Sequence, residues 1–252
     1  MDVGEAVVER KATILMLHGW AQSGWILRHR TEKMRKRLRS AGYETLYLDA
    51  PHHLPLKSHA DVDGKLGGAA HAGGRKNARC WFFYSSEDMC DASRSLEQVE
   101  YLGLAESVSR VVDTLSQIEG NIAILGFSQG ATFCHILSSM GAATTDEGRG
   151  LQALRKIKCS IMFSGFESQH KSKSLHESGE LRCTAPSQRR IDIKSLHVIG
   201  ASDTSVPRKY GQNLAKCFNE AECYVHAGGH VIPQNLDCSK RIVAFLDGVF
   251  RR

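Results

Sequence analysis

Short apolar runs alternate with longer segments of helical periodicity, and this alternation limits most strongly what the chain can fold into. The runs are rich in β-branched and aliphatic residues. Such an alternation indicates βα units on a mostly parallel sheet with helices on both faces, because both faces of a parallel strand are covered. We expect strands at residues 12–18, 43–49, 121–127, 159–164, 196–200 and 222–226.

The segments between these runs predict helices. Residues 25–41 form one candidate, ended by Gly42, and residues 129–140 and 237–250 form two more. A fourth candidate, residues 104–119, has its apolar side chains on one face, as a helix packed on a sheet does. These side chains are Leu104, Val108, Val111, Leu115 and Ile118.

Three polar or glycine-rich segments interrupt the alternation. They are residues 52–79, 141–156 and 167–190. Each follows an element of the expected sheet, so we expect loops or lids on a single domain that spans residues 1–252, and no linker between two domains.

Composition excludes several classes of protein. The chain has 252 residues, of which 42% are hydrophobic and 24% charged, which excludes disordered, collagen-like and coiled-coil proteins. No apolar run approaches the ~18 residues that a membrane-spanning helix needs. The start, Met1 to Glu5, lacks the basic and apolar regions of a secretory signal. We therefore expect a cytoplasmic protein, with the nucleus as a second location.

The charge and the cysteines are less informative. The net charge is +6, and many cations lie between residues 28 and 39. This stretch is either the solvated face of an amphipathic helix or a patch for an anion or a nucleic acid. Because no aromatic residues are interleaved with the cations, we expect no nucleic-acid partner. The eight cysteines contain no C-x-x-C pair, which favours reduced thiols and no metal site. The cations are Arg28, Arg30, Lys33, Arg35, Lys36, Arg37 and Arg39.

Gly126-Phe127-Ser128-Gln129-Gly130 matches the Gly-x-Ser-x-Gly nucleophile elbow. The match closes the most apolar expected strand and opens an expected helix, as a sharp turn that exposes a serine requires. The alternative is a serine that only caps the helix.

A serine nucleophile needs a histidine base and an acid that orients it, in the chain order Ser, acid, His for this elbow. Asp203 follows one expected strand, and His230 lies in a glycine-rich loop after the next. Asp203 has a helix cap as its alternative role, and Asp192, which we expect just before its strand, is the weaker candidate for the acid. His226 is the other candidate base, although as a strand residue it is expected to pack on the sheet.

A negatively charged tetrahedral intermediate needs N–H donors. The elbow offers the backbone N–H of Gln129. The loop after the first strand offers that of Trp20, since Gly19 allows the chain to turn there. His18 is expected to brace this loop as a hydrogen-bonded histidine.

Several linked motifs resemble the FSH family of α/β-hydrolase serine hydrolases over residues 13–250. The motifs are Leu15-Met16-Leu17-His18-Gly19, Trp20-Ala21-Gln22-Ser23-Gly24, Tyr47-Leu48-Asp49-Ala50-Pro51, Cys80-Trp81-Phe82-Phe83, Tyr101-Leu102-Gly103-Leu104 with Glu106-Ser107, the elbow with Ala131, Phe163-Ser164-Gly165-Phe166, and Gly228-Gly229-His230 with Pro233. Residues 141–156 and 167–190 look longer or more polar than the family core. This departure bears on the substrate pocket and not on the three candidate catalytic residues.

The resemblance implies an α/β-hydrolase fold and a serine hydrolase for carboxylic esters or thioesters, with a small-molecule ester or acyl substrate and no metal or cofactor. In its terms Ser128 attacks the carbonyl, His230 moves the proton and Asp203 holds the imidazole. Four aromatic residues are either an acyl pocket or plain core. The alternatives are a thioesterase on acyl-protein or acyl-CoA, a peptidase, and a binding protein whose three candidate residues are idle. The aromatic residues are Trp81, Phe82, Phe83 and Phe166.

Overall fold

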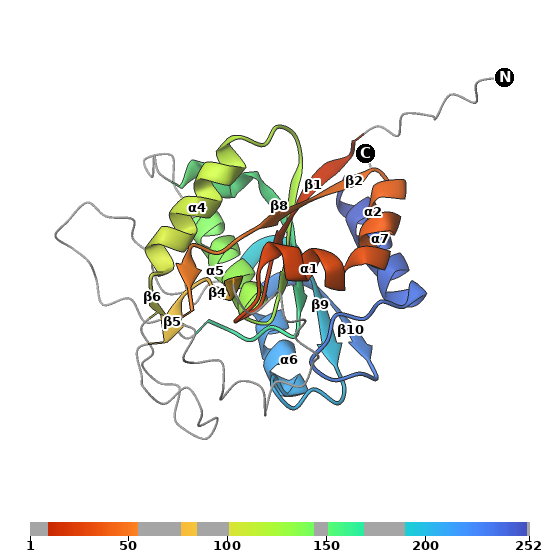
Figure 1. Cartoon of the computed structure of the whole chain (residues 1–252). Coiled ribbons are helices and arrows are strands. Elements are labelled where there is room, and N and C mark those ends of the chain that lie inside the picture. Colours follow the sequence, from red (N-terminus) through yellow and green to blue (C-terminus); the bar gives the residue numbers. More distant parts are fainter. Residues whose placement is uncertain (1–9, 55–76, 85–100, 144–150, 169–189, 251–252) are drawn as a thin grey trace.

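The computed structural model describes residues 10–54, 77–84, 101–143, 151–168 and 190–250 (Figure 1). Its centre is a six-stranded sheet in the order β10-β9-β8-β7-β1-β2, and every pairing in it is parallel. The expected parallel sheet is therefore confirmed. The strands are β1 (Ala12–Leu17), β2 (Tyr43–Leu48), β7 (Ile122–Phe127), β8 (Ile157–Phe163), β9 (Ile191–Gly200) and β10 (Phe218–His226).

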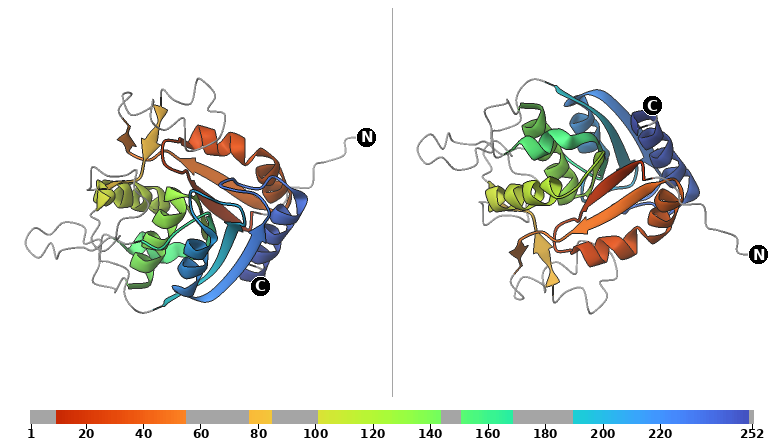
Figure 2. Two further views of the ribbon diagram at one scale, coloured as in Figure 1. Left: turned by 90° about the horizontal axis from the view of Figure 1, so that it is seen from below. Right: turned by 90° about the horizontal axis from the view of Figure 1, so that it is seen from above.

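Helices cover both faces of the sheet, as Figure 2 shows. Successive β1 side chains point to opposite faces: Leu15 packs with one set of helices and Ile14 with the other. The first face carries α4 (Leu104–Ser116), α5 (Gln129–Ala143) and α6 (Arg208–Lys216). The second carries α1 (Gly24–Arg30), α2 (Glu32–Ser40) and α7 (Leu236–Phe250).

The strand order reverses between β1 and β7. The chain runs from β1 outward to β2 and then crosses back to β7 on the other side of β1, where Leu17 pairs with Gly126. Open α/β sheets bind ligands beyond the carboxyl ends of the strands at such a switch point. The switch point lies where the predicted serine elbow ends β7.

Strand burial follows position in the sheet. Every residue of β1 and β7 is buried, whereas β10, at one edge, is exposed along most of its length. Both β9 and β10 start earlier than predicted. The first residues of β9 alternate between apolar and polar and those of β10 are mostly polar, so neither start has the continuous apolar run that predicts a buried parallel strand.

The helix predicted at residues 25–41 is wrong in its continuity, because α1 and α2 are separate helices that meet at Thr31. The buried Thr31 hydroxyl bonds to the Leu27 carbonyl at 2.8 Å and to the Tyr47 hydroxyl at 2.7 Å. These bonds hold Thr31 at φ −112°, outside helical geometry. The α2 helix buries Met34 and Leu38 and exposes most of its cations, as an amphipathic surface helix does.

The three irregular segments contain short elements. Residues 52–79 include β3 (His52–His53) and the start of β4 (Arg79–Cys80), and residues 141–156 include the end of α5 and the 3₁₀ helix η3 (Gln152–Lys156). β3 pairs antiparallel with β4, and beyond these segments β5 (Phe83–Tyr84) pairs antiparallel with β6 (Tyr101–Leu102). Residues 55–76, 144–150 and 169–189 of these segments lie outside the described residues, and the single-domain organisation stays a prediction. Within the described parts of the chain, no helix is long and apolar enough to span a membrane.

Candidate active site

Ser128 occupies a sharp turn between β7 and α5. Its φ of 54° lies in the left-handed region, which is rare for a residue with a side chain. Its backbone N–H donates to the Phe163 carbonyl of the neighbouring strand at 2.9 Å. The strand–turn–helix geometry expected for residues 126–130 is therefore present, and such strained residues concentrate at functional sites.

The two glycines of the elbow have no room for a side chain. A Cβ on Gly126 would lie 2.2 Å from the Gly130 carbonyl oxygen. A Cβ on Gly130 would lie 2.2 Å from the carbonyl oxygen of Leu17 and 2.5 Å from that of His18. The first turn of α5 thus packs directly against the end of β1, which brings the elbow next to the loop that follows β1.

Three side chains from three strand ends form a hydrogen-bonded series. His230 Nε2 lies 3.0 Å from Ser128 Oγ, and His230 Nδ1 lies 2.8 Å from Asp203 Oδ2. Because a carboxylate only accepts, Nδ1 carries the proton and Nε2 accepts from the serine hydroxyl. The Asp203 side chain is fully buried, while that of His230 is 18% exposed. The predicted serine, histidine and acid are thus brought together.

The Asp203 carboxylate also fixes its own turn. Oδ1 accepts the backbone N–H groups of Ser205 at 3.0 Å and Val206 at 2.8 Å, which leaves Oδ2 for the imidazole. The N-cap of α6 is Pro207. The alternative of a simple helix cap is therefore wrong, because Asp203 lies one turn too early.

The competing acid and base lie elsewhere. Asp192 belongs to β9, so its expected position before the strand is wrong; its polar partner is Asn219, at 3.2 Å, near the amino end of the sheet. That end is opposite to Ser128. His226 ends β10 and accepts the Gly228 N–H at 3.2 Å, which supports the turn before His230. Burial lowers the pKa of His226, and nearby Asp203 partly offsets this shift.

The two predicted N–H donors belong to segments that meet where the elbow packs on the end of β1. Gln129 is the first residue of α5, where a backbone N–H has no carbonyl within the helix to bond to and the helix dipole favours negative charge. Trp20 follows Gly19 in the loop after β1. A Cβ on Gly19 would lie 3.0 Å from the Phe127 ring, so this loop packs closely on the end of β7.

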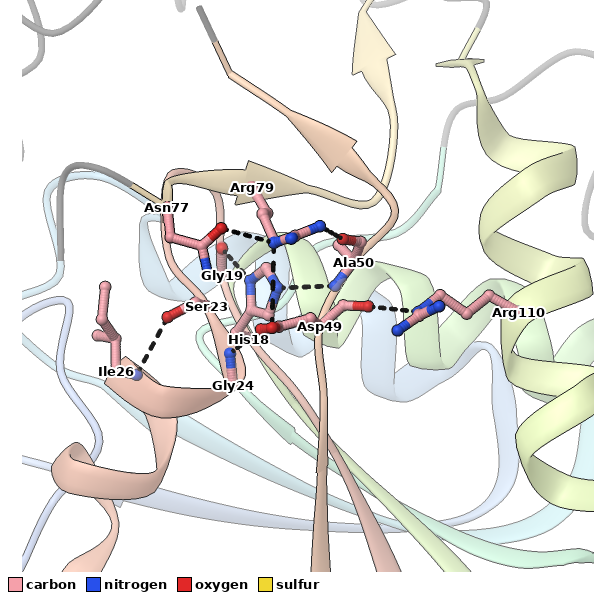
Figure 3. A network of polar contacts seen from close by, with 10 residues as sticks. All are labelled: His18, Gly19, Ser23, Gly24, Ile26, Asp49, Ala50, Asn77, Arg79 and Arg110. Atoms are coloured by element: carbon pink, nitrogen blue, oxygen red, sulfur yellow. Dashed lines mark hydrogen bonds and ion pairs between the residues drawn. The ribbon is translucent and has the colours of Figure 1, made fainter. Parts of the chain in front are cut away.

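The loop after β1, residues 18–24, is held by the side chain of His18 (Figure 3). The ring is completely buried; Nδ1 donates to the Gly19 carbonyl at 2.8 Å and Nε2 accepts the Ala50 N–H at 3.1 Å. Burial lowers the pKa of His18 to about 4. At neutral pH the ring is uncharged, as a group that both donates and accepts must be. His18 braces the loop as expected.

Asp49 and Arg79 hold the other end of the same loop, as Figure 3 also shows. Asp49 Oδ1 accepts the Gly24 N–H at 2.7 Å, and its Oδ2 lies 4.0 Å from Arg79 Nε. Arg79 donates to the Ala50 carbonyl at 2.9 Å, and Arg110 donates to the Asp49 carbonyl at 2.7 Å. Sequence reasoning assigned no role to these charges; the only signal was the motif around Asp49-Ala50-Pro51.

The four aromatic candidates divide into two groups. Trp81 and Phe82 are fully buried and belong to the main core, so core packing accounts for them. Phe83 and Phe166 are half-buried. Phe83 lies edge-on to the Trp20 ring, with 6.2 Å between ring centroids. These two aromatics are the ones with exposed surface for an apolar substrate group.

Neither metal ligands nor bonded cysteines are found in the portion of the chain that the structure covers. Among those residues, no group of three His, Cys, Asp or Glu side chains could hold a metal ion. The six described cysteines are free thiols, and burial raises the pKa of Cys80 to about 12. Cys90 and Cys183 lie outside the described residues.

Comparisons with known proteins agree on one family and one fold. Residues 8–242 match the family described as serine hydrolase (FSH1). The chain is 30% identical to human esterase OVCA2 over 246 residues, covering 95% of this chain and 97% of that protein. It is also 30% identical to esterase C25G4.2 of Caenorhabditis elegans, covering 94% and 93% of the two chains.

The fold is similar to that of acyl-protein thioesterase 2 from Zea mays, with a TM-score of 0.58, 19% identity and 96% of each chain covered. At this identity the likeness establishes the α/β-hydrolase fold alone, as expected from the elbow and the parallel sheet. The match to the family covers most of the chain. The chain therefore belongs to the FSH1 family of serine hydrolases.

Proposed function

We propose that this protein hydrolyses carboxylic esters of small molecules through an acyl-enzyme on Ser128. The observation that carries the proposal is the hydrogen-bonded series from Ser128 through His230 to Asp203, at 3.0 and 2.8 Å. Membership of a serine hydrolase family supports it, as do relatives named esterases, of which the matches cover 93% and 97%.

In the first half of the reaction, Ser128 Oγ attacks the ester carbonyl carbon while its proton passes to His230 Nε2. The imidazolium that forms is stabilised by the Asp203 carboxylate, which also keeps the ring in the tautomer with hydrogen on Nδ1. Collapse of the intermediate breaks the bond to the leaving oxygen. His230 returns the proton to that oxygen, which leaves as an alcohol.

The negative charge of each tetrahedral intermediate is stabilised by the backbone N–H groups of Trp20 and Gln129. Such preorganised donors contribute roughly 10²–10³-fold each to kcat in serine hydrolases. In the second half, water attacks the acyl carbon and gives its proton to His230. Ser128 takes the proton back as the carboxylic acid leaves.

The proposal is tested by hydrolysis of p-nitrophenyl esters of graded chain length by the wild type, Ser128→Ala and His230→Ala. We expect both variants to lose at least about 10³-fold in kcat, because the members of such a series act as a unit. Ser205→Ala is the matched control, since its exposed side chain is removed while its N–H to Asp203 remains. Full activity of Ser128→Ala would contradict the proposal.

A parallel series of acyl thioesters with the same acyl groups decides between the two kinds of substrate. We expect higher kcat/KM for the oxygen esters. The reverse preference would make the protein a thioesterase with the same residues in the same roles. A folded wild type that hydrolyses neither series would favour a binding protein on the hydrolase scaffold.

A further inference from the structure

Trp81 makes hydrogen bonds in two directions from the buried core. Its indole Nε1–H donates to the His18 carbonyl at 2.8 Å, and its backbone N–H donates to Gln129 Oε1 at 2.9 Å. The two partners are far apart in the sequence and belong to different elements. His18 follows β1, and Gln129 begins α5.

Each partner belongs to a segment with one of the proposed oxyanion donors. The His18 carbonyl lies two residues before the Trp20 N–H, and Gln129 carries the second donor on its own backbone. Gln129 Nε2 also donates to the Phe82 carbonyl at 2.8 Å, so its amide is bonded to the Trp81-Phe82 backbone on both sides. One short segment thus connects both donors.

The connection is rigid because it is buried and closely packed. Trp81 is fully buried and Gln129 is 2% exposed. The indole ring stacks on Phe133 at 4.9 Å and lies 5.1 Å from the His18 ring, while the Trp81 carbonyl accepts from the Ser107 hydroxyl of α4. A buried polar group left without a partner costs stability, so displacing either segment is unfavourable.

We propose that Trp81 is a positioning residue that fixes the separation of the two oxyanion donors, in addition to filling the core. This inference rests on the proposed function. Oxyanion stabilisation depends on donors held at fixed positions before charge develops, and displacement of a reacting group by about 1 Å is able to cost about 10²-fold in rate. The hydrogen bond from the indole N–H to the His18 carbonyl is what connects Trp81 to the loop after β1, and a substitution of Trp81 that removes this N–H would break it.

The test is Trp81→Phe, which keeps an aromatic ring and removes the indole N–H. We expect kcat for a p-nitrophenyl ester to fall at least about tenfold with KM within about twofold, since a misplaced donor acts on the transition state. Affinity for an alkyl boronic acid, whose tetrahedral adduct resembles the intermediate, should fall by the same factor.

The matched control is Phe218→Leu, which replaces a buried aromatic side chain of the same core. The ring contacts of Phe218 are to His135 and His197, and not to the segments that carry the donors. It should lower the melting temperature while kcat stays within about threefold of the wild type, because it does not touch the donor segments. Equal losses of kcat in the two variants would mean that Trp81 acts through packing alone, which would overturn the inference.

A second variant separates shape from hydrogen bonding. Replacement of Trp81 by 3-benzothienylalanine, in which sulfur takes the place of the indole N–H, keeps the size of the ring. We expect the loss in kcat to persist and the loss in melting temperature to shrink; wild-type kcat would overturn the inference. If the wild type itself hydrolysed no ester, the proposed function would fail. Equal losses of kcat in Trp81→Phe and Phe218→Leu, with an active wild type, would overturn only the role of Trp81.

Discussion

Two loops that carry the candidate active site are held in different ways. The loop after β1 is bound to several distant segments: His18 bonds to Ala50, Gly24 to Asp49, and the Gln22 carbonyl to the Arg79 N–H. The loop after β10, residues 227–231, bonds mainly to the neighbouring loop after β9. Ser202 holds it there: its hydroxyl donates to the Ala227 carbonyl at 3.0 Å in an exposed hydrogen bond, and its backbone N–H donates to the Gly228 carbonyl at 3.2 Å.

The difference between the two loops matches a difference in the proposed roles of the two halves of the site. The half of the site that would stabilise negative charge is fixed by many long-range contacts around the buried His18 and Gln129, as a preorganised donor requires. The half that would move protons combines the fully buried Asp203 side chain with a His230 side chain that is 18% exposed, and its loop after β10 is held mainly by the adjacent loop after β9. We therefore expect substitutions in the first half to lower both stability and activity, and substitutions in the second half to lower activity alone.

The largest effect is expected for Asp203→Asn, at the buried acid of the half that would move protons. The amide keeps an oxygen for the Ser205 and Val206 N–H groups but turns an N–H₂ toward His230 Nδ1, which favours the wrong tautomer. In the serine protease example of this change kcat falls about 10⁴-fold, and we expect a loss of this order. Steady-state kinetics and a melting curve check this expectation. A loss in kcat under tenfold, or a large fall in melting temperature, would contradict the contrast between the two halves of the site.

The next largest effect is expected at Gly130, which packs on the end of β1, and we compare it with Gly229 in the loop after β10. Gly130→Ala places a Cβ 2.2 Å from the Leu17 carbonyl, and we expect a loss of about 3 kcal/mol or more in the free energy of unfolding. Gly229→Ala places a Cβ 3.3 Å from the Ser202 carbonyl, with no positive φ, and should cost less than about 1 kcal/mol. Urea unfolding measures both, and equal losses would remove the contrast.

Acidification should lower the free energy of unfolding, because the loop after β1 depends on the buried, uncharged His18. Burial lowers the pKa of His18 to about 4, so between pH 6.5 and 4 the unfolded chain binds a proton that the folded one does not. Stability therefore falls as pH falls through this window, by up to about 1.4 kcal/mol per pH unit for each such histidine. His135 and His197, with pKa lowered by burial to about 4 and about 3, add to the slope.

Urea unfolding at pH 7 and pH 5 measures this loss. His135→Gln removes one titrating group and keeps an acceptor for the Ser168 N–H that bonds to His135 at 3.1 Å. The variant should show a shallower dependence on pH than the wild type. A free energy of unfolding that does not change between the two pH values would contradict the buried, uncharged state of these rings.

The smallest effect is expected for Ser202→Ala. The substitution removes the exposed hydrogen bond to the Ala227 carbonyl, 3.0 Å long. We expect a change in the free energy of unfolding within about 0.5 kcal/mol and a kcat within about threefold of the wild type, as for surface positions in general. A loss as large as that of Gly130→Ala would show that the loop after β10 is as strongly held as the loop after β1.

The sequence predicted the parts of the molecule that depend on local chemistry. The elbow at Gly126 and Gly130 has a fixed spacing, and Asp203 and His230 follow strands in loops, so their meeting at one sheet edge follows from the parallel order. The break at Thr31 was not predicted, because it depends on a hydroxyl bond to Tyr47 across two elements.

The network that supports the donors was also not predictable. Gln129, Asp49 and Arg79 are ordinary polar residues in the sequence, and their partners become neighbours only after the whole sheet has formed. Trp81 and Phe82 were equally consistent with a substrate pocket, and only their complete burial assigns them to the core.

The proposed reaction requires Ser128 to be an activated nucleophile. The most direct test is covalent labelling with a fluorophosphonate, followed by intact mass, of the wild type, Ser128→Ala, His230→Ala and the control Ser205→Ala. We expect one adduct on the wild type and on Ser205→Ala, and none on the other two variants in the same time. Equal labelling of Ser128→Ala, or no labelling of a folded wild type, would contradict it.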